Sequence, residues 1–223
     1  IETVFYPIGL CDVLEIEPSE GCTDYSFSAS GIPLSGDPEE NLIVKAYRLL
    51  QSEYDIPPVD ISLIKQIPFG AGLGGGSADA AFTLKMLNEM FELKITPRKL
   101  EKLAAVLGAD CPVFIRNKAV YATGIGNVFS PAKISLKGYF LVLIKPDIHV
   151  STPEAYSLVI PEKSDVSIAE NIQRPISEWK ALIKNDFEKS VFALHPEIAE
   201  IKNNLYAAGA VYASMSGSGS SVY

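Results

Sequence analysis

Hydrophobic and polar positions follow two different periods in the first part of the chain. Residues 59–67 alternate between apolar and polar side chains, which is typical of a strand with one buried face. In residues 41–53 the apolar positions instead recur every three or four residues, as they do on one face of a helix. The pattern therefore predicts an amphipathic helix over residues 41–53 and a strand over residues 59–67.

Two further helices carry start or stop signals. From Ser77 the composition changes to Ala, Leu and Met, which favours a helix that ends near Glu92. Thr96 followed by Pro97 predicts the start of the next helix, because a Thr oxygen can cap the first turn and Pro fits its fixed φ. Gly108 is expected to end that helix, since glycine is common just beyond a helix end.

The remaining elements are predicted from residue types. Segments rich in β-branched and aromatic residues predict strands, and beyond Pro146 the pattern becomes mainly helical. This change predicts two domains, residues 1–148 and 149–223, in an α+β protein with a mixed or antiparallel sheet in the first domain. The predicted strands are residues 1–16, 25–30, 113–122 and 138–145, and the predicted helices are residues 177–194 and 196–208.

The charge balance of the chain is acidic. Its 19 Lys and Arg residues against 27 Asp and Glu residues give a formal net charge of −8. An acidic chain does not attract nucleic acid or an anionic membrane over its whole surface, and no apolar run approaches the roughly 20 residues that span a bilayer. We therefore expect no nucleic-acid partner and no membrane partner. A polyanion such as ATP would have to be bound by local donors.

The cysteine and histidine residues indicate neither a disulfide framework nor a zinc site. Cys11, Cys22 and Cys111 are odd in number, widely spaced and without a CxxC pair. Only two histidines, His149 and His195, are present. The cysteines are typical of reduced thiols, so we expect a cytoplasmic protein; whether it is a monomer or a homodimer stays open.

Residues 68–81 combine a glycine-rich loop with the start of a helix. Five of the seven residues 70–76 are glycine, which permits positive φ and close approach of the backbone to a ligand. Ser77 then opens a helix whose free N–H groups face the loop, and we expect Ser77 to cap it, with contact to a metal ion as the second option. Loop and helix together predict an anion site suited to phosphate groups.

Three other interpretations of this loop are weaker. A flexible linker rarely runs from a strand straight into an Ala-rich helix. A P-loop requires Gly-Lys-Ser/Thr, and here Gly76 is followed directly by Ser77. A dinucleotide-binding motif requires an acidic residue at a strand end about 20 positions later, whereas Glu89 and Glu92 fall inside or at the end of the predicted helix.

The run Pro68-Phe-Gly-Ala-Gly-Leu-Gly-Gly-Gly-Ser-Ala-Asp-Ala-Ala81 resembles the second motif of the GHMP kinases, which include galactokinase and homoserine, mevalonate and phosphomevalonate kinases. The triple glycine followed by Ser-x-Asp-Ala-Ala resembles the form of the diphosphocytidyl-methylerythritol kinases. The resemblance extends over nearly the whole chain. It includes the catalytic segment at residues 107–114, an Asn-Asp-x-Glu element at residues 185–188 and a third glycine-rich motif at residues 215–220.

This resemblance implies a two-lobed GHMP kinase fold, with an N-terminal lobe like ribosomal protein S5 domain 2 and an α/β C-terminal lobe. It implies ATP-dependent phosphorylation of the 2-hydroxyl of a small cytidyl alcohol, 4-diphosphocytidyl-2-C-methyl-D-erythritol, in non-mevalonate isoprenoid synthesis. ATP and Mg²⁺ are the implied cofactors, with the metal ligands unknown. Another GHMP kinase, of the homoserine or mevalonate type, and a non-catalytic nucleotide-binding fragment remain as alternatives.

The resemblance also implies roles for individual residues. Asp110 is expected to act as the base or orienting acceptor for the attacking hydroxyl, although the residues alone equally allow a plain cap for the next segment. The expected contacts to ATP are Asn41, Lys65, Pro68, Phe69, Gly70, Ala71, Gly72, Leu73, Gly74, Gly75, Gly76, Ser77 and Ala78. The expected contacts to the cytidyl substrate are Phe5, Ile125, Thr152 and Tyr156, with core packing as the alternative for the two aromatic residues.

Two family segments do not occur in this chain. The family pattern begins with Pro-x-Lys-Ile-Asn and Asp-Gly-Tyr-His, and the chain resembles the region that follows them. At the other end the chain stops near the third motif. We therefore expect the sequence to be truncated at both ends, as a fragment or an ordered portion of a longer protein, with a naturally shortened nucleotide-binding protein as the alternative.

Overall fold

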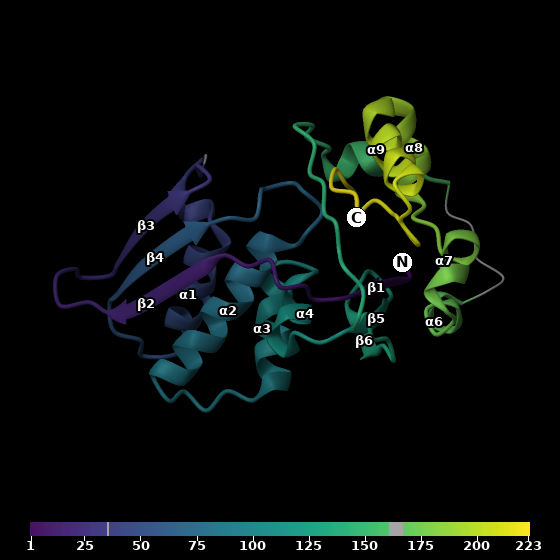
Figure 1. Ribbon diagram of the computed structural model, residues 1–223. Helices are drawn as coiled ribbons and strands as arrows, with labels where there is room; N and C mark the ends of the chain where they lie inside the picture. Colours follow the sequence, from purple (N-terminus) through teal and green to yellow (C-terminus); the bar gives the residue numbers. More distant parts are fainter. Residues whose placement is uncertain (35, 161–166) are drawn as a thin grey trace. The chain divides into compact units, whose positions relative to one another are not determined.

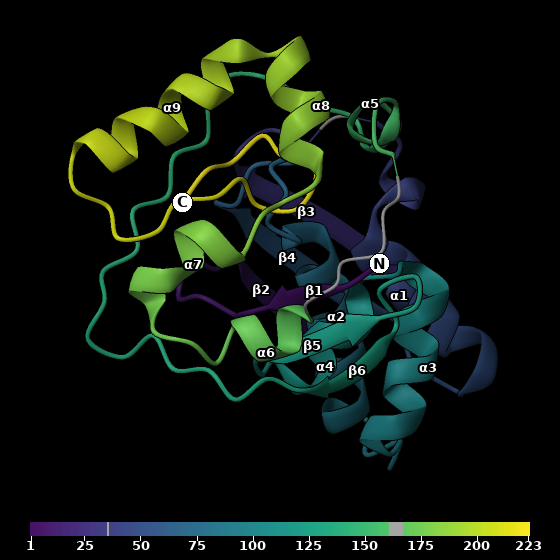
Figure 2. The same cartoon turned by 90° about the vertical axis from the view of Figure 1, so that its right-hand side faces the viewer.

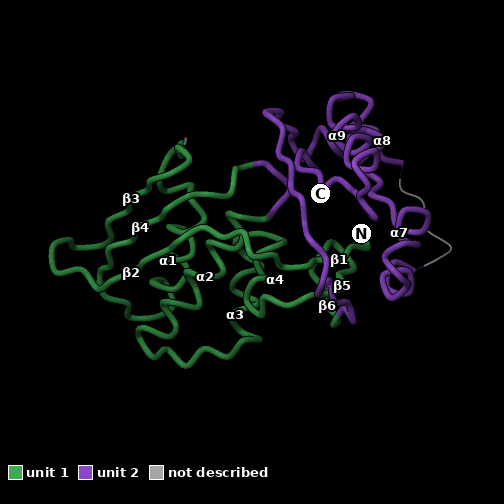
Figure 3. Tube along the Cα trace, in the orientation of Figure 1, with its two compact units in different colours: residues 1–69, 74–131 green, residues 70–73, 132–223 purple. Residues whose placement is uncertain are grey.

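The computed structural model describes residues 1–34, 36–160 and 167–223 (Figure 1). Their contacts divide the chain into two compact units. Unit 1 consists of Ile1–Phe69 and Gly74–Pro131, and unit 2 consists of Gly70–Leu73 and Ala132–Tyr223 (Figure 3). These units differ from the predicted domains, residues 1–148 and 149–223, because the second unit begins earlier and includes four residues of the glycine-rich loop. The domain assignment itself stays a prediction.

Unit 1 contains a mixed sheet of three strands. The strands lie in the order β2 (Val13–Pro18), β4 (Val59–Lys65) and β3 (Tyr25–Gly31), with β2 antiparallel and β3 parallel to β4. Alternation along β4 buries Val59 and every second residue after it, so one face of the strand lies in the core. The strands predicted over residues 25–30 and 59–67 are confirmed.

Four helices complete the core of unit 1. They are α1 (Leu42–Glu53), α2 (Gly75–Met90), α3 (Pro97–Leu107) and α4 (Cys111–Arg116), and the short 3₁₀ helix η1 (Pro38–Glu40) precedes them. The cap predicted at Thr96 is confirmed, because its side chain accepts a hydrogen bond from Lys99 N. At the start of α1 the Asn41 side chain accepts a hydrogen bond from Ile43 N, a cap that was not predicted.

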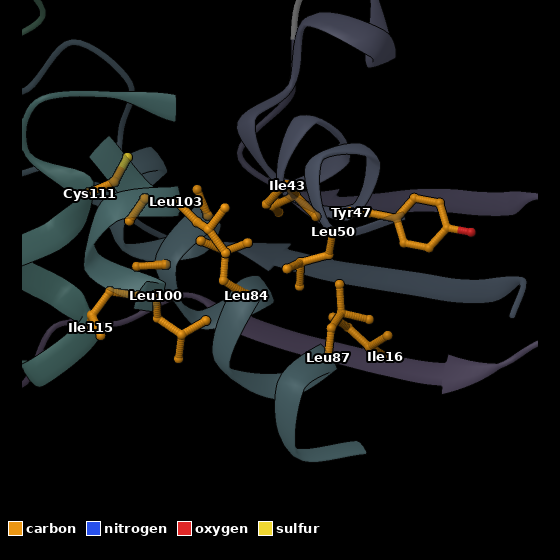
Figure 4. Close-up of a cluster of buried hydrophobic side chains, with 14 of the residues drawn as sticks. Ile16, Ile43, Tyr47, Leu50, Leu84, Leu87, Leu100, Leu103, Cys111 and Ile115 are labelled. Carbon is orange, nitrogen blue, oxygen red and sulfur yellow. The ribbon is translucent and has the colours of Figure 1, made fainter. Parts of the chain in front are cut away.

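The buried side chains of these helices meet those of the sheet in a single hydrophobic cluster. The members that Figure 4 labels come from β2, α1, α2, α3 and α4. The cluster is continuous from the strands to α4, and it therefore holds the start of α2 and the start of α4 within one packed body. The labelled residues are Ile16, Ile43, Tyr47, Leu50, Leu84, Leu87, Leu100, Leu103, Cys111 and Ile115.

A second, smaller sheet in unit 1 is antiparallel. It has the order β1 (Thr3–Phe5), β5 (Val120–Thr123) and β6 (Val128–Pro131). The strand predicted over residues 1–16 is thus two strands, β1 and β2. The strand predicted over residues 113–122 is wrong in its first half, where α4 forms instead. Pro112 lies in the first turn of α4, where its fixed φ favours helix, and a short apolar run cannot by itself distinguish a strand from a buried helix.

Unit 2 is mainly helical in the part that the structure describes. Its helices are α5 (Thr152–Tyr156), α6 (Ile168–Asn171), α7 (Ile176–Leu182), α8 (Phe187–Leu194) and α9 (Pro196–Ala207). His195 ends α8 and precedes α9, and Figure 2 shows the two helices in succession. The single helix predicted over residues 177–194 is wrong: Ile183 is extended, and the Asn185 side chain accepts a hydrogen bond from Phe187 N at the start of α8. The helix predicted over residues 196–208 is confirmed.

The strand predicted over residues 138–145 is also wrong. Among the described residues, this segment makes only one β-bridge, between Ile144 and Val222, and Phe140 is fully exposed. High β-propensity reflects packing against neighbouring strands, so a segment without such neighbours remains irregular. Over the described ranges no helix has both the length and the apolar character to cross a bilayer.

Candidate active site

The start of α2 has no side-chain cap. Gly74 occupies the N-cap position with a left-handed backbone (φ +69°), and Ser77 is the third residue of the helix. The prediction that Ser77 caps this helix is therefore wrong, because the helix begins two residues earlier. The first-turn N–H groups and the positive end of the helix dipole remain available to an anion, as the sequence predicted for this loop.

The start of α4 lies beside the start of α2. The Phe114 ring packs so closely on Gly74 that a Cβ added there would lie 3.0 Å from Phe114 Cζ. Burial raises the pKa of the Cys111 thiol, partly offset by a hydrogen bond with Ser77. These two contacts, one from each turn of α4, bring Asp110, the residue directly before α4, close to the uncapped helix start.

Asp110 is free to act on a ligand. Gly108 ends α3 before it, and the Asp110 side chain makes no capping hydrogen bond to α4, so the plain capping role does not apply. Over the described ranges its carboxylate has no ion pair or hydrogen bond either. Although the residue reaches solvent, the surrounding protein desolvates the carboxylate, and this desolvation raises its pKa. A carboxylate with a raised pKa and no partner is suited to accept a proton or to orient a hydroxyl group.

The first half of the glycine-rich loop belongs to unit 2 and packs against the third glycine-rich motif. Ser216 Oγ donates to Gly72 O over 2.7 Å, and Ser221 N donates to Ala71 O over 3.2 Å. Gly72 has φ +71°, and a Cβ at this position would lie 2.1 Å from the backbone oxygen of Ser216. Only glycine fits there, because both the positive φ and the close backbone approach exclude a side chain.

The third motif is held in turn by the Asn-Asp-Phe-Glu element. Asn185 Nδ2 donates to the backbone oxygens of Met215 and Gly217, each over 2.8 Å. Glu188 Oε1 accepts from Met215 N over 2.9 Å, and Lys202 forms an ion pair with the same carboxylate. This element therefore supports the turn that contacts Gly72.

The two residues predicted at the adenine pocket are engaged in unit 1. The Asn41 side chain caps α1. Lys65 is only 1% exposed, and its ammonium group pairs with Asp12 over 2.6 Å and with Asp79 over 2.7 Å. Both observations give these side chains structural partners; their contact with ATP stays a prediction.

The predicted substrate residues fall into separate groups. Phe5 is half-buried in β1 opposite Val120, whereas Ile125 is exposed in the turn beyond Thr123, at the other end of the same sheet. The structure therefore does not bring these two residues together. Thr152 and Tyr156 lie at the two ends of α5 in unit 2.

Tyr156 is partly available for stacking. The residue is 44% exposed, and its ring makes a T-shaped contact with the Phe187 ring, 4.7 Å between centroids. A partner thus orients the ring without burying it, as a stacking platform requires.

Several neighbours of the loop were not predicted from the sequence. His149 lies against Gly70, where an added Cβ would be 2.8 Å from the imidazole. Asp12 and Asp79 hold Lys65, as described above. Only the contacts of Lys65 leave a trace in the sequence, because the alternation of β4 places this residue on the core face, where a lysine requires acidic partners.

The acidic and sulfur or imidazole side chains of the described residues form no group of three that could hold a metal ion. Mg²⁺ bound with a nucleotide uses phosphate oxygens and water for most of its ligands, so it does not require such a group. The uncapped start of α2 and the glycine positions that exclude a Cβ fit the phosphates of a nucleotide.

Two protein-family models match the chain. The model described as "GHMP kinases N terminal domain" matches residues 41–118, and the model described as "GHMP kinases C terminal" matches residues 168–223. Together they include both glycine-rich motifs and Asp110. The fold and the site thus define a GHMP-type kinase.

The relatives narrow this class. A 4-diphosphocytidyl-2-C-methyl-D-erythritol kinase of Bacteroides fragilis is 59% identical over 224 residues, covering 100% of this chain and 82% of the relative. One of Bacteroides thetaiotaomicron is 57% identical with the same coverage. A crystal structure of a 4-(cytidine 5'-diphospho)-2C-methyl-D-erythritol kinase matches with a TM-score of 0.79 and 31% identity, over 99% of this chain and 79% of that one. The chain belongs to the GHMP kinases and, within them, to the 4-diphosphocytidyl-2-C-methyl-D-erythritol kinase family.

Proposed function

We propose that the protein transfers the γ-phosphoryl group of ATP to the 2-hydroxyl of 4-diphosphocytidyl-2-C-methyl-D-erythritol, giving the 2-phosphate and ADP. The observation that carries this proposal is the position of Asp110, a carboxylate that has no ion pair with any described residue and lies beside the uncapped start of α2. The relatives at 59% and 57% identity supply the substrate, because no residue considered alone demands a cytidine group.

Each part of the site has a role in this reaction. The N–H groups at the start of α2 hold phosphate oxygens, and the positive end of the helix dipole stabilises their charge. Asp110 accepts a hydrogen bond from the attacking hydroxyl, orients it in line with the γ-phosphorus and takes its proton as the new O–P bond forms. Mg²⁺ supplies further positive charge at the phosphates when it is bound.

The cytidyl group of the substrate is expected to contact unit 2 through α5. Tyr156 is partly exposed and its ring is oriented by Phe187, which suits stacking on a cytosine base. Thr152 is exposed in the first turn of the same helix, where its hydroxyl can donate to a polar group of the substrate. Contact of Phe5 and Ile125, both in unit 1, with the substrate stays a prediction.

The test measures ADP release with the cytidyl alcohol, mevalonate and homoserine supplied separately. We expect turnover on the cytidyl alcohol alone, and a loss of about 100-fold or more in kcat for Asp110→Asn, because the orienting acceptor and base would be gone. Asp55→Asn is the matched control, since Asp55 is an exposed carboxylate of unit 1 in the segment between α1 and β4. Turnover on mevalonate or homoserine instead would overturn the substrate, and an unchanged Asp110→Asn would overturn the role of that residue.

A further inference from the structure

Three charged side chains meet in the interior of unit 1. Lys65 Nζ pairs with Asp12 Oδ2 over 2.6 Å and with Asp79 Oδ2 over 2.7 Å. The side chains of Lys65, Asp12 and Asp79 are 1%, 2% and 9% exposed. They come from the end of β4, from the segment before β2 and from α2, so this buried triad joins three separate parts of the chain.

The triad is not explained by stability alone. Alternation along β4 places Lys65 on the same face as Val59, Ile61 and Leu63, all of them core residues. Burying an ammonium group among apolar side chains is unfavourable unless it is paired, and apolar residues of similar size often stabilise a core as well as a buried ion pair does. The charges therefore point to a function at this position.

The triad reaches both ends of the glycine-rich loop. Asp12 Oδ1 accepts from Gln66 N over 2.6 Å and from Ile67 N over 2.8 Å, which fixes the backbone just before the loop. Lys65 Nζ also lies 4.9 Å from the centroid of the Phe69 ring, in the first residues of the loop.

The other end of the loop rests on the same ammonium group. Asp79 lies one helical turn after Gly75, on the same face of α2. A Cβ added to Gly75 would lie 3.3 Å from Lys65 Nζ and 2.8 Å from Ile67 Cγ2. The start of α2 thus lies directly against the triad, and two of the three N–H donors of Lys65 are taken by its carboxylate partners.

We propose that Asp12, Lys65 and Asp79 are positioning residues that set the place of the start of α2, and thereby of the N–H groups that bind the phosphates of ATP, without touching the nucleotide. This inference rests on the proposed nucleotide-binding function and replaces a direct contact of Lys65 with adenine. A shift of the helix start by a fraction of an ångström moves every donor of its first turn, which is why the position needs buried charges on both sides.

The test compares two probes that separate the parts of ATP. Adenosine carries the base and ribose, and tripolyphosphate carries the phosphates. For Lys65→Met we expect the affinity for tripolyphosphate to fall about tenfold or more and the affinity for adenosine to stay within about twofold. Lys99→Met is the matched control, because Lys99 is also an ion-paired lysine of unit 1, with Glu53 as its partner at the surface. It should bind both probes as the unchanged protein does.

Two results would overturn the proposal. Loss of adenosine affinity with tripolyphosphate affinity retained would show that Lys65 contacts the base. Equal loss of both, or of neither, would show that the triad is only part of the core. Turnover by the unchanged protein tests the proposed function separately. If the unchanged protein does not bind tripolyphosphate, there is no phosphate site for the triad to position, and this inference is overturned.

A second pair of variants guards against misfolding of Lys65→Met. Asp79→Asn keeps an oxygen acceptor for Lys65 and offers N–H donors toward Asp12, whose carboxylate lies within hydrogen-bonding reach of Asp79. Asp79→Ala removes the contact altogether. We expect Asp79→Asn to bind tripolyphosphate within about threefold of the unchanged protein and Asp79→Ala to lose about tenfold, with adenosine affinity unaffected in both. Equal affinity of the two variants for tripolyphosphate would contradict the positioning role.

Discussion

The two halves of the glycine-rich loop are held by different interactions. Residues Gly70–Leu73 pack against the third motif through neutral hydrogen bonds and through backbone atoms that approach Gly72 without a side chain between them. The start of α2 is held by the buried charges of Lys65 and Asp79. The conformation of the first half therefore depends on close packing of the backbone, and that of the second half depends on the ion pairs of the triad. The two halves should respond to different perturbations.

The largest effect is expected in the first half of the loop, from Gly72→Ala. The new Cβ would lie 2.1 Å from Ser216 O, a backbone atom that cannot rotate away, and alanine would also have to adopt φ +71°. We expect kcat/KM for ATP to fall by about 100-fold or more, because the loop donors lose their position. Steady-state kinetics with varied ATP measures this loss.

Gly21→Ala is the control for that substitution. Gly21 has no heavy atom within 4 Å of its added Cβ and does not require positive φ, so its activity should match that of the unchanged protein. If Gly72→Ala keeps its activity, shape does not govern this half of the loop.

A smaller effect is expected at the other half, from Gly75→Ala. An added Cβ would meet Ile67 Cγ2 at 2.8 Å and lie against the buried triad, so we expect a loss of about 1–3 kcal/mol in the free energy of unfolding.

Gly76→Ala is the matched variant in the same turn. Its Cβ meets only Leu42 at 3.8 Å, an ordinary contact, and alanine favours helix over glycine by about 1 kcal/mol. Urea unfolding should therefore show Gly75→Ala as clearly less stable than Gly76→Ala. Equal stabilities would mean that the start of α2 is not held tightly against the triad.

The smallest effect concerns the charge balance itself. Burial raises the pKa of Asp79 from 3.8 to about 6, although the hydrogen bond and charge of Lys65 act in the opposite direction. The folded protein therefore binds this proton more tightly than the unfolded chain, and the Asp79 contribution to stability falls as the pH rises from about 4 to about 6. Asp12 has a lowered pKa: desolvation raises it, but the Lys65 hydrogen bond and two backbone amides together outweigh that effect.

Asp79→Asn removes the titration and keeps the shape. We expect the stability of the variant relative to the unchanged protein to increase by about 1–2 kcal/mol between pH 4 and pH 7. Thermal or urea unfolding across this range measures the difference. The charged groups that shift the pKa of Asp79 are Lys65 from β4 and Asp12 from the segment before β2. Charged side chains of α1 and α3 form ion pairs with other residues, as in Arg48–Asp24 and Lys99–Glu53. If the difference in stability between Asp79→Asn and the unchanged protein does not change with pH, the raised pKa of Asp79 does not contribute to stability.

Local signals predicted those parts of the fold that depend on neighbouring residues. Thr96 and Gly108 act within one helical turn, and each acts as predicted. The kinase family and the glycine-rich loop were predicted from a run of 14 residues, residues 68–81, because phosphate binding by backbone groups leaves a compositional pattern. The comparisons confirm that family.

Features that depend on distant partners could not be predicted in this way. The segment 138–145 has strand-forming residues but lacks neighbouring strands, and α4 was mistaken for a strand because three apolar residues fit either period. The triad joins Asp12 and Lys65 across 53 residues. The alternation of β4 placed Lys65 on a buried face but could not say which carboxylates would meet it there.

The bond between Ser216 and Gly72 spans 144 residues of the chain, and it has a consequence for folding order. Contacts that are distant in sequence form late, because closing a long loop costs conformational entropy before the contact is gained. During synthesis, the helices and strands of residues 13–116 can collapse on the ribosome while Gly70–Leu73 still lacks the third motif that shapes it. A nascent chain with a finished core would therefore carry an unfinished phosphate loop, and nucleotide binding would begin only after Ser216 has been added.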